Sequence, residues 1–447
     1  MAKTLPLGGR LTLRDYPDIK VSAATLRTPA TTFTAARDIA ATPAKPCERI
    51  GVLDVLRGIA LLGMFFVHLN DHAIDPGGGF GHAYRRIVEL FFSGRFWAMF
   101  AILFGAGFGV QLRRADARGD AFIARYLRRL LGLAVFGFIA EGFFGFNVLL
   151  GYAIWGVPLL LVRRWTNKTI VIALVLCAAT GPLPVVARGT YLTLIGHSEQ
   201  FKTERHAQDQ QDLVAYETYW TTTQSTDYPT VVAARFGYMP IFYSRPTSFL
   251  PFNDFSLFLI GLLGLRLGLF EEPRRHRRLI TGLMIFGAAS WVAAEGLFPL
   301  VPLSVGFAQT VPLPIRLAAL FSVRSGVFGL LREMWLAFTY IGAILLLVAH
   351  NPAWLQRLGA FAITGRMALT NYMLQVIILD LAFSNYAFGA KISAAYAPLA
   401  AVALFVIDVV ASRWWLSRYR YGPLEWLWRS TTFARWQPFR RVVAAGG

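Results

Sequence analysis

The sequence has few charged residues for its length. Asp, Glu, Lys and Arg make up 15% of the 447 residues, against about 25% in an ordinary soluble domain. Hydrophobic residues make up 55%, and several apolar runs reach the roughly 20 residues that a helix needs to cross a bilayer. The shortage of charge and the long apolar runs together predict an all-α, polytopic integral membrane protein whose main partner is the lipid bilayer.

Other absences exclude several classes of protein. The two cysteines, Cys47 and Cys177, cannot define a disulfide framework or a cysteine-based metal site. No GxxxxGK[ST] loop is present, which argues against an ATP-driven pump. The sequence also lacks an HExxH motif, which would have indicated a metal site. We therefore predict no metal.

Acidic residues are also scarce, and their shortage leaves a net charge of +19. Many of the arginines stand in short turns between apolar runs, where cytoplasmic loops of membrane proteins gather positive charge. The basic balance is therefore interpreted as a topology signal, and no nucleic-acid partner is predicted.

The apolar runs predict about ten spans with both termini in the cytoplasm. A flexible basic cytoplasmic arm (1–48) precedes a membrane domain (49–432), which contains an extracytoplasmic insertion (187–247), and a cytoplasmic tail (433–447) follows. The predicted spans are Ile50–Leu69, Glu89–Gln111, Leu130–Gly145, Asn147–Val162, Thr169–Val186, Ser248–Phe270, Leu279–Phe298, Glu333–His350, Arg366–Phe383 and Pro398–Trp415. The proline-interrupted segment 299–332 is expected to lie at the membrane interface. The expected location is the bacterial inner membrane.

The first span carries three ionisable residues, Asp54, Arg57 and His68. Charges within a span usually face the protein interior or a wet cavity. At about 100° per residue, Arg57 and His68 lie within about 20° on one face and about 16 Å apart along the axis. Asp54 stands one turn from Arg57, close enough to pair with it. This pair is either a structural lock or part of an anion site.

Three further groups of residues are candidates for function. Glu141 lies inside the third apolar run, where an acid is a functional candidate by default. Arg125, Arg128 and Arg129 form a cationic strip at the predicted cytoplasmic face, which suits either lipid headgroups or the phosphates of a cofactor. Arg366 is predicted to open the ninth span on the same side.

Two sets of motifs resemble known families. Residues 53–69, LDVLRGIALLGMFFVHL, resemble the opening helix of the membrane acyltransferase superfamily, and the spacing from Arg57 to His68 matches its acyltransferase-3 family. The stretches Gly365–Gln375 and Gly422–Arg429, with Ser93–Phe96, Leu103–Gly105 and Tyr126–Leu131, resemble the YeiB-like family, domain of unknown function 418. This resemblance extends from about Arg49 to Thr432.

The resemblance implies an acyltransferase that moves an acyl group from a cytoplasmic acyl-CoA-like donor to an extracytoplasmic hydroxyl or amine. Arg57, Arg125, Arg128, Arg129 and Arg366 would bind the donor, and His68 would act as general base or transient acyl carrier, with Asp54 and Glu141 assisting. YeiB-like proteins often have Asn at the position of His68. They also often have a His and a Gly-Asp in the region where this chain has Glu141. The role of that His and Asp is therefore either lost here or taken by Glu141.

The alternative interpretation is a membrane transporter or exporter of a small anionic or amphipathic solute, whose path the same polar residues would line. A third is a scaffold or lipid-sensing protein. The acyl group, the acceptor and the oligomeric state are left open by the sequence.

Overall fold

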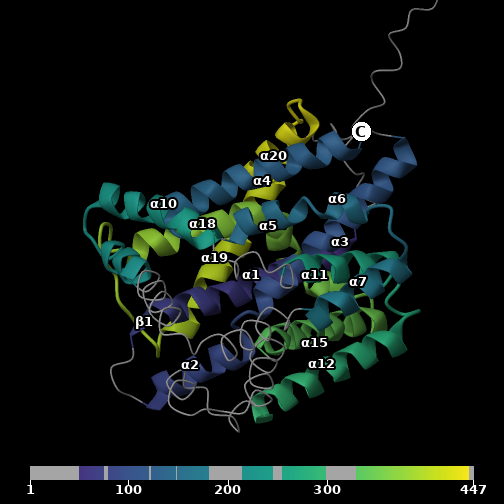
Figure 1. Ribbon diagram of the computed structural model, residues 1–447, viewed down its shortest axis with the longest axis horizontal. Coiled ribbons are helices and arrows are strands. Elements are labelled where there is room, and N and C mark those ends of the chain that lie inside the picture. Colours follow the sequence, from purple (N-terminus) through teal and green to yellow (C-terminus); the bar gives the residue numbers. More distant parts are fainter. Residues whose placement is uncertain are drawn as a thin grey trace, which may run out of the picture. The chain divides into compact units, whose positions relative to one another are not determined.

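The computed structural model describes residues 50–74, 79–119, 122–146, 148–180, 214–244, 254–297 and 329–441. The predicted arm, the segment 299–328 and the first part of the insertion lie outside these residues. Nearly all regular structure within them is helical (Figure 1). The exception is a parallel pair of two-residue strands, β1 (Ala73–Ile74) and β2 (Ile392–Ser393).

The helices are named as in Figure 1. They are α1 (Gly51–His72), α2 (Gly79–Phe91), α3 (Arg95–Arg118), α4 (Phe122–Phe144), α5 (Val148–Gly156), α6 (Leu159–Val162), α7 (Asn167–Thr180), α10 (Tyr228–Ser244), α11 (Asp254–Arg266), α12 (Arg277–Leu297), α15 (Gly329–His350), α16 (Trp354–Arg357), α17 (Gly359–Arg366), α18 (Ala368–Phe383), α19 (Ala397–Arg418) and α20 (Pro423–Phe433).

The prediction of a helical membrane protein is confirmed at this coarser level. Three helical segments of the described residues, Gly51–His72, Gly79–Arg118 and Ala397–Arg418, are long and apolar enough to cross a bilayer. A fourth span results if α17 and α18, whose axes differ by 82°, count as one broken span. Helix α4 has spanning length at 23 residues but carries Arg125, Arg128, Arg129 and Glu141. The figure of ten spans therefore stays a prediction.

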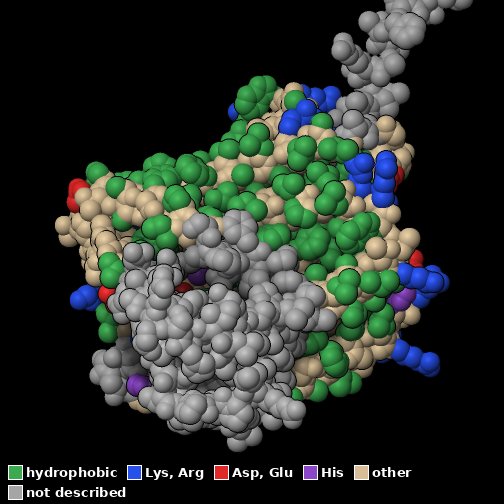
Figure 2. Space-filling model, viewed as in Figure 1, with side chains coloured by type: hydrophobic (Ala, Val, Ile, Leu, Met, Phe, Trp, Pro, Cys, Tyr) green, Lys and Arg blue, Asp and Glu red, His purple; other side chains and the backbone are tan. Residues whose placement is uncertain are grey.

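The surface is compatible with contact to lipid. Figure 2 shows a face on which hydrophobic side chains predominate, while lysines and arginines gather near its edges. Large apolar side chains such as Leu131, Leu161 and Val175 are each more than 60% exposed. A soluble protein rarely exposes so much contiguous apolar surface, whereas a spanning helix must present such side chains to the acyl chains of the lipids.

Helix α1 contacts several other helices, among them α3, α17, α18 and α19. Its contact with α17 depends on two glycines. A Cβ atom at Gly58 would lie 2.0 Å from the carbonyl oxygen of Phe361, and one at Gly365 would lie 1.8 Å from that of Asp54. Small residues allow membrane helices to approach this closely. The approach brings the end of α17, with Arg366, beside Asp54.

Several predicted helices are broken in the structure. The predicted helix Glu89–Gln111 is divided between α2 and α3 at Gly94, which has a φ of 79° that favours glycine. The predicted helix Asn147–Val162 is interrupted before Pro158, because proline lacks the N–H that an interior helical position donates. Helix α2 begins at Gly79, ten residues before the predicted helix start at Glu89.

The prediction that Arg366 opens the ninth span is wrong. Arg366 is the last residue of α17, and α18 begins at Ala368 after the non-helical Met367. The sharp bend depends on contacts distant in sequence: α17 packs on α1 through Gly365, and the start of α18 is bound by Glu425 of α20. A local pattern contains neither contact.

Candidate functional site

A cavity of about 230 Å³ lies among α1, α3, α4, α5, α17, α18 and α20. Along α1 its lining runs from Asp54 and Arg57 to Met64, which spans about 15 Å of helix axis. Residues from both ends of the chain therefore form one cavity. The full lining is Asp54, Arg57, Met64, Trp97, Phe100, Leu103, Phe104, Gly107, Arg129, Leu133, Val148, Leu149, Tyr152, Gly365, Arg366, Ala368, Leu369, Tyr372, Glu425, Trp428 and Arg429.

Positive charge dominates the charged part of this lining. Four arginines stand against two carboxylates, and each arginine comes from a different helix: Arg57, Arg129, Arg366 and Arg429. Arg129 lies within electrostatic range of Arg57 and Arg429. Guanidinium groups that converge in this way suit phosphate or carboxylate, which they bind through paired hydrogen bonds.

Arg57 and Arg129 are held by contacts with neighbouring residues. Arg57 donates a hydrogen bond to Asp54 over 3.0 Å, which confirms the predicted pair. The Arg57 side chain is 28% exposed. The guanidinium of Arg129 lies 3.7 Å from the ring centre of Trp428, and the Trp428 indole donates to the Arg129 carbonyl. These contacts hold the two cations in place at the cavity wall.

Glu425 joins the tail helix α20 to the start of α18. Its Oε1 accepts hydrogen bonds from the backbone N–H groups of Leu369 (2.7 Å) and Thr370 (3.1 Å), and the Thr370 hydroxyl donates to Oε2. A carboxylate satisfies the free N–H groups of a helix N-terminus. Burial nevertheless raises the pKa of Glu425, and the hydrogen bonds from Thr370 and Leu369 oppose that rise.

The rest of the cavity is largely apolar and aromatic. Helix α3 contributes Trp97, Phe100 and Phe104. Tyr152 of α5 donates its hydroxyl hydrogen to the Trp97 carbonyl over 2.9 Å. An apolar, elongated space next to a cationic region fits a ligand that has an uncharged arm and an anionic head.

His68 lies beyond this cavity on α1. It is one turn from Met64, the last cavity-lining residue of α1, but is not itself part of the lining. The residue is 8% exposed, and its ring packs edge-on against the Phe146 ring, with 4.9 Å between the ring centres. Its Nδ1 has no hydrogen-bond partner among the described residues. The structure thus places Asp54, Arg57, Arg129 and Arg366 together and leaves His68 about one turn further on.

The remaining predicted site residues lie elsewhere. Glu141 is 8% exposed and accepts a hydrogen bond from Tyr243 over 2.8 Å. Arg128 donates to the Thr432 carbonyl over 3.1 Å, and Arg125 lies 5.5 Å above the ring of Phe433. The latter two residues therefore contact α20 outside the cavity lining. No cluster of three or more potential metal ligands occurs in the part of the chain that the structure describes.

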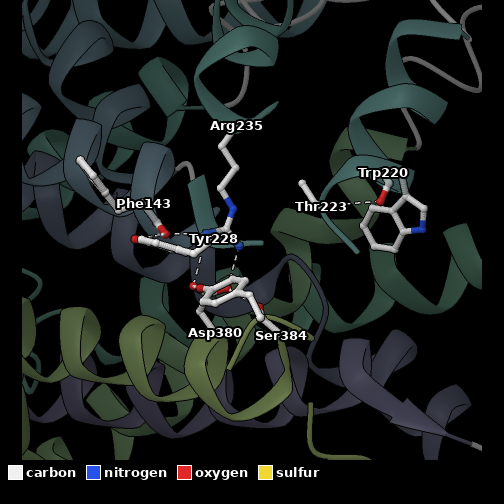
Figure 3. Close-up of polar contacts among 8 residues, drawn as sticks. Phe143, Trp220, Thr223, Tyr228, Arg235, Asp380 and Ser384 are labelled. Carbon is white, nitrogen blue, oxygen red and sulfur yellow. Dashed lines mark hydrogen bonds and ion pairs between the residues drawn. The ribbon is translucent and has the colours of Figure 1, made fainter. Parts of the chain in front are cut away.

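A buried ion pair joins the insertion to the far end of α18 (Figure 3). Arg235 of α10 donates to Asp380 over 2.7 Å, and both side chains are at least 93% buried. Asp380 also accepts from Ser384 and Tyr386, while Arg235 donates to the Phe143 carbonyl. Removing one partner of such a pair typically costs about 3–5 kcal/mol, so this contact fixes α10 on the helices that carry the cavity.

Four cavity-lining residues with a hydroxyl or a charge were not among the predicted site residues: Tyr152, Tyr372, Glu425 and Arg429. Glu425 and Arg429 stand in the motif Gly422–Arg429, which indicated only the family resemblance. The binding of Glu425 to α18 has no sequence signal. Tyr372 also stands in such a motif. Asn371, in the motif Gly365–Gln375, donates to Ser412 of α19 over 2.9 Å and so joins α18 to α19.

Residues 49–231 match the catalytic domain of heparan-alpha-glucosaminide N-acetyltransferase, and residues 265–435 match a protein family of unknown function, DUF418. YxaH of Bacillus subtilis, an uncharacterized protein, is 28% identical over 422 residues, which cover 88% of this chain and 96% of YxaH. YeiB of Escherichia coli, also uncharacterized, is 25% identical over 416 residues, which cover 86% of this chain and 96% of YeiB.

The chain is a distant homologue of YeiB and YxaH. The predicted resemblance to the YeiB-like family and to the membrane acyltransferases is therefore confirmed. The two matched regions meet in the cavity, because Asp54 to Tyr152 come from the acetyltransferase-like region and Gly365 to Arg429 from the DUF418 region. No solved structure matches the chain.

Proposed function

We propose that this YeiB homologue is a multi-pass inner-membrane acyltransferase. It would take an acyl group from an acyl-CoA-like donor at the cytoplasmic face and pass it to an extracytoplasmic amine or hydroxyl. The match to an acetyltransferase catalytic domain favours acetyl-CoA as the donor and an amine as the acceptor. The single observation that carries the proposal is the cavity lined by four arginines from four helices.

The residues present fit such a donor. Phosphate groups would bind Arg57, Arg129, Arg366 and Arg429, which offer the forked donors that phosphates prefer. The uncharged arm would lie along the aromatic wall of α3. In this arrangement the thioester extends along α1 from Arg57 toward His68. Arg125 and Arg128 would bind phosphates only outside the cavity.

The reaction follows from ordinary acyl-transfer chemistry. The amine nitrogen attacks the thioester carbonyl carbon, a C–N bond forms, the C–S bond breaks, and the thiolate leaves and takes up a proton. His68 takes the proton that the nitrogen loses, which the neutral imidazole can do as a general base, or it carries the acyl group transiently. Glu141 lies within electrostatic range of Tyr372 in the cavity wall and would favour a cationic acceptor there.

The proposal is tested with purified protein in lipid vesicles, labelled acetyl-CoA and a panel of amines and alcohols. We expect transfer of the label to at least one acceptor, and a loss of about 10²- to 10⁴-fold in His68→Ala. His350→Ala, at the exposed end of α15, is the matched control and should keep full turnover. Undiminished activity in His68→Ala would remove the role of His68. Solute flux without covalent turnover would instead support the alternative function of a membrane transporter or exporter.

A further inference from the structure

One side chain of the cavity has a hydrogen-bonding group without a protein partner. Tyr372 of α18 lines the cavity and is 5% exposed. Its hydroxyl oxygen is buried and has no hydrogen-bond partner among the described residues. Among the described residues that line the cavity, no other side-chain oxygen is both buried and without a hydrogen-bond partner. Leaving a buried hydroxyl without a partner costs about 1–3 kcal/mol.

The second tyrosine of the cavity provides the comparison. Tyr152 satisfies its hydroxyl by donating to the Trp97 carbonyl, so its oxygen has a structural role. The Tyr372 hydroxyl has no such role in the described structure. Buried polar groups are nearly always satisfied, and those that are not call for an explanation such as a bound water or a ligand.

We infer that the Tyr372 hydroxyl donates a hydrogen bond to the carbonyl oxygen of the acyl group that the protein transfers. The inference rests on the proposed function and adds a catalytic residue to it. A phenol donates one hydrogen bond, and the uncharged carbonyl oxygen of a thioester can accept it. The neighbouring carboxylate of Glu141, when ionised, can only accept, so among these two groups the phenol is the donor.

The position of Tyr372 suits this role. Ala368, Leu369 and Tyr372 of α18 all line the cavity, and α18 begins two residues after Arg366. A donor whose phosphates bind the arginines, and whose arm extends along α1 toward His68, would therefore also pass the first turn of α18 and meet Tyr372 in the same cavity. Glu425 fixes this first turn through Leu369 and Thr370, which keeps the phenol in a constant place.

The consequence for the reaction is stabilisation of developing charge. When the amine nitrogen attacks the carbonyl carbon, the π electrons of the C=O bond move to the oxygen, and the hydrogen bond from Tyr372 strengthens. Collapse of this intermediate restores the C=O bond and expels the thiolate, which takes up a proton. Removing one such donor typically lowers turnover by about 10²- to 10³-fold.

The test uses the full-length protein, Tyr372→Phe and acetyl-CoA labelled with ¹³C at the carbonyl carbon. Phenylalanine keeps the ring and removes only the hydroxyl, so the fold should be preserved. In the wild type we expect the infrared carbonyl band of the bound donor to shift to lower wavenumber than in free acetyl-CoA. In Tyr372→Phe the band should return toward the free value, while donor affinity changes by less than about tenfold, as expected for one hydrogen bond.

Tyr340→Phe is the matched control. It removes a hydroxyl from α15 that donates to the Phe91 carbonyl, outside the cavity, and it should leave the carbonyl band unchanged. Turnover with the best acceptor should fall in Tyr372→Phe through kcat and not through KM.

Three results would overturn the inference. An identical carbonyl band in wild type and Tyr372→Phe would show that the hydroxyl does not bond the carbonyl oxygen. A loss confined to donor affinity shows a binding contact only. Failure of the wild type to bind acetyl-CoA would contradict the proposed function as well. Equilibrium binding of labelled acetyl-CoA to the wild type distinguishes this outcome from the other two.

Discussion

At the scale of single residues, the charges of the first span carry most of the functional argument. Arg57 and Asp54 pair as their spacing predicts, and both line the cavity. The sequence could indicate this much because i,i+3 neighbours on a helix are fixed by its geometry. It could not indicate that Arg429 and Tyr372 line the same cavity, since they are more than 300 positions away from Arg57 along the chain.

We predict that Arg57→Gln weakens the binding of acetyl-CoA by about 10- to 150-fold, as expected for the loss of a charge-assisted hydrogen bond. Calorimetric titration of the purified protein measures this change. Arg275→Gln, at an arginine whose side chain is 78% exposed, should bind acetyl-CoA as the wild type does.

Stability must be separated from binding in this experiment. Arg57→Gln removes the guanidinium from Asp54, whose side chain is 6% exposed, and should lower the unfolding temperature. The double variant Asp54→Asn/Arg57→Gln removes both charges, and we expect it to regain stability but not affinity. Recovery of affinity in the double variant would show that Arg57 does not bind the donor.

At the scale of helices, the sequence located most of the long apolar segments but not their breaks. Apolar length and periodicity indicate where a helix lies, which is why α1, α15 and α19 agree closely with the predicted spans. The bend between α17 and α18 depends on Gly58, Gly365 and Glu425, which act through neighbouring helices. Such tertiary contacts are absent from any local pattern.

We predict that Gly58→Val destabilises the protein more than Gly51→Val does. A Cβ at Gly58 would meet the Phe361 carbonyl at 2.0 Å, whereas nothing lies within 4 Å of one at Gly51. Overpacking of this kind costs about 1–3 kcal/mol or more, and it would also displace Arg366 from Asp54. Thermal unfolding of both variants in detergent measures the difference. Equal unfolding temperatures would contradict the close packing of α1 on α17.

At the scale of the whole molecule, composition was sufficient to predict a helical membrane protein, and the structure confirms this. Topology is a finer matter, because orientation depends on the distribution of positive charge between loops. We therefore propose that the tail is cytoplasmic and that the insertion is extracytoplasmic.

Cysteine labelling tests this orientation. In a Cys47→Ser/Cys177→Ser background, Thr226→Cys in the insertion should react with a membrane-impermeant maleimide in intact cells. Ser417→Cys at the end of α19 should react only after permeabilisation. Both positions are described, and Thr226 and Ser417 are exposed, so access to the thiol is not limiting. The opposite pattern would invert the proposed topology and the direction of transfer.

Whether the cavity lined by four arginines holds the acyl donor is tested by saturable binding of labelled acetyl-CoA to a variant whose cavity is filled. Gly107 lines the cavity, and the nearest described atom to a Cβ there is Nη2 of Arg57 at 3.8 Å. Gly107→Leu can therefore fold while its side chain occupies the donor space. Gly282→Leu, at an exposed position of α12 with nothing within 4 Å of its Cβ, is the control. We predict loss of binding in Gly107→Leu alone, at an unchanged unfolding temperature; wild-type binding in Gly107→Leu would show that the donor lies elsewhere.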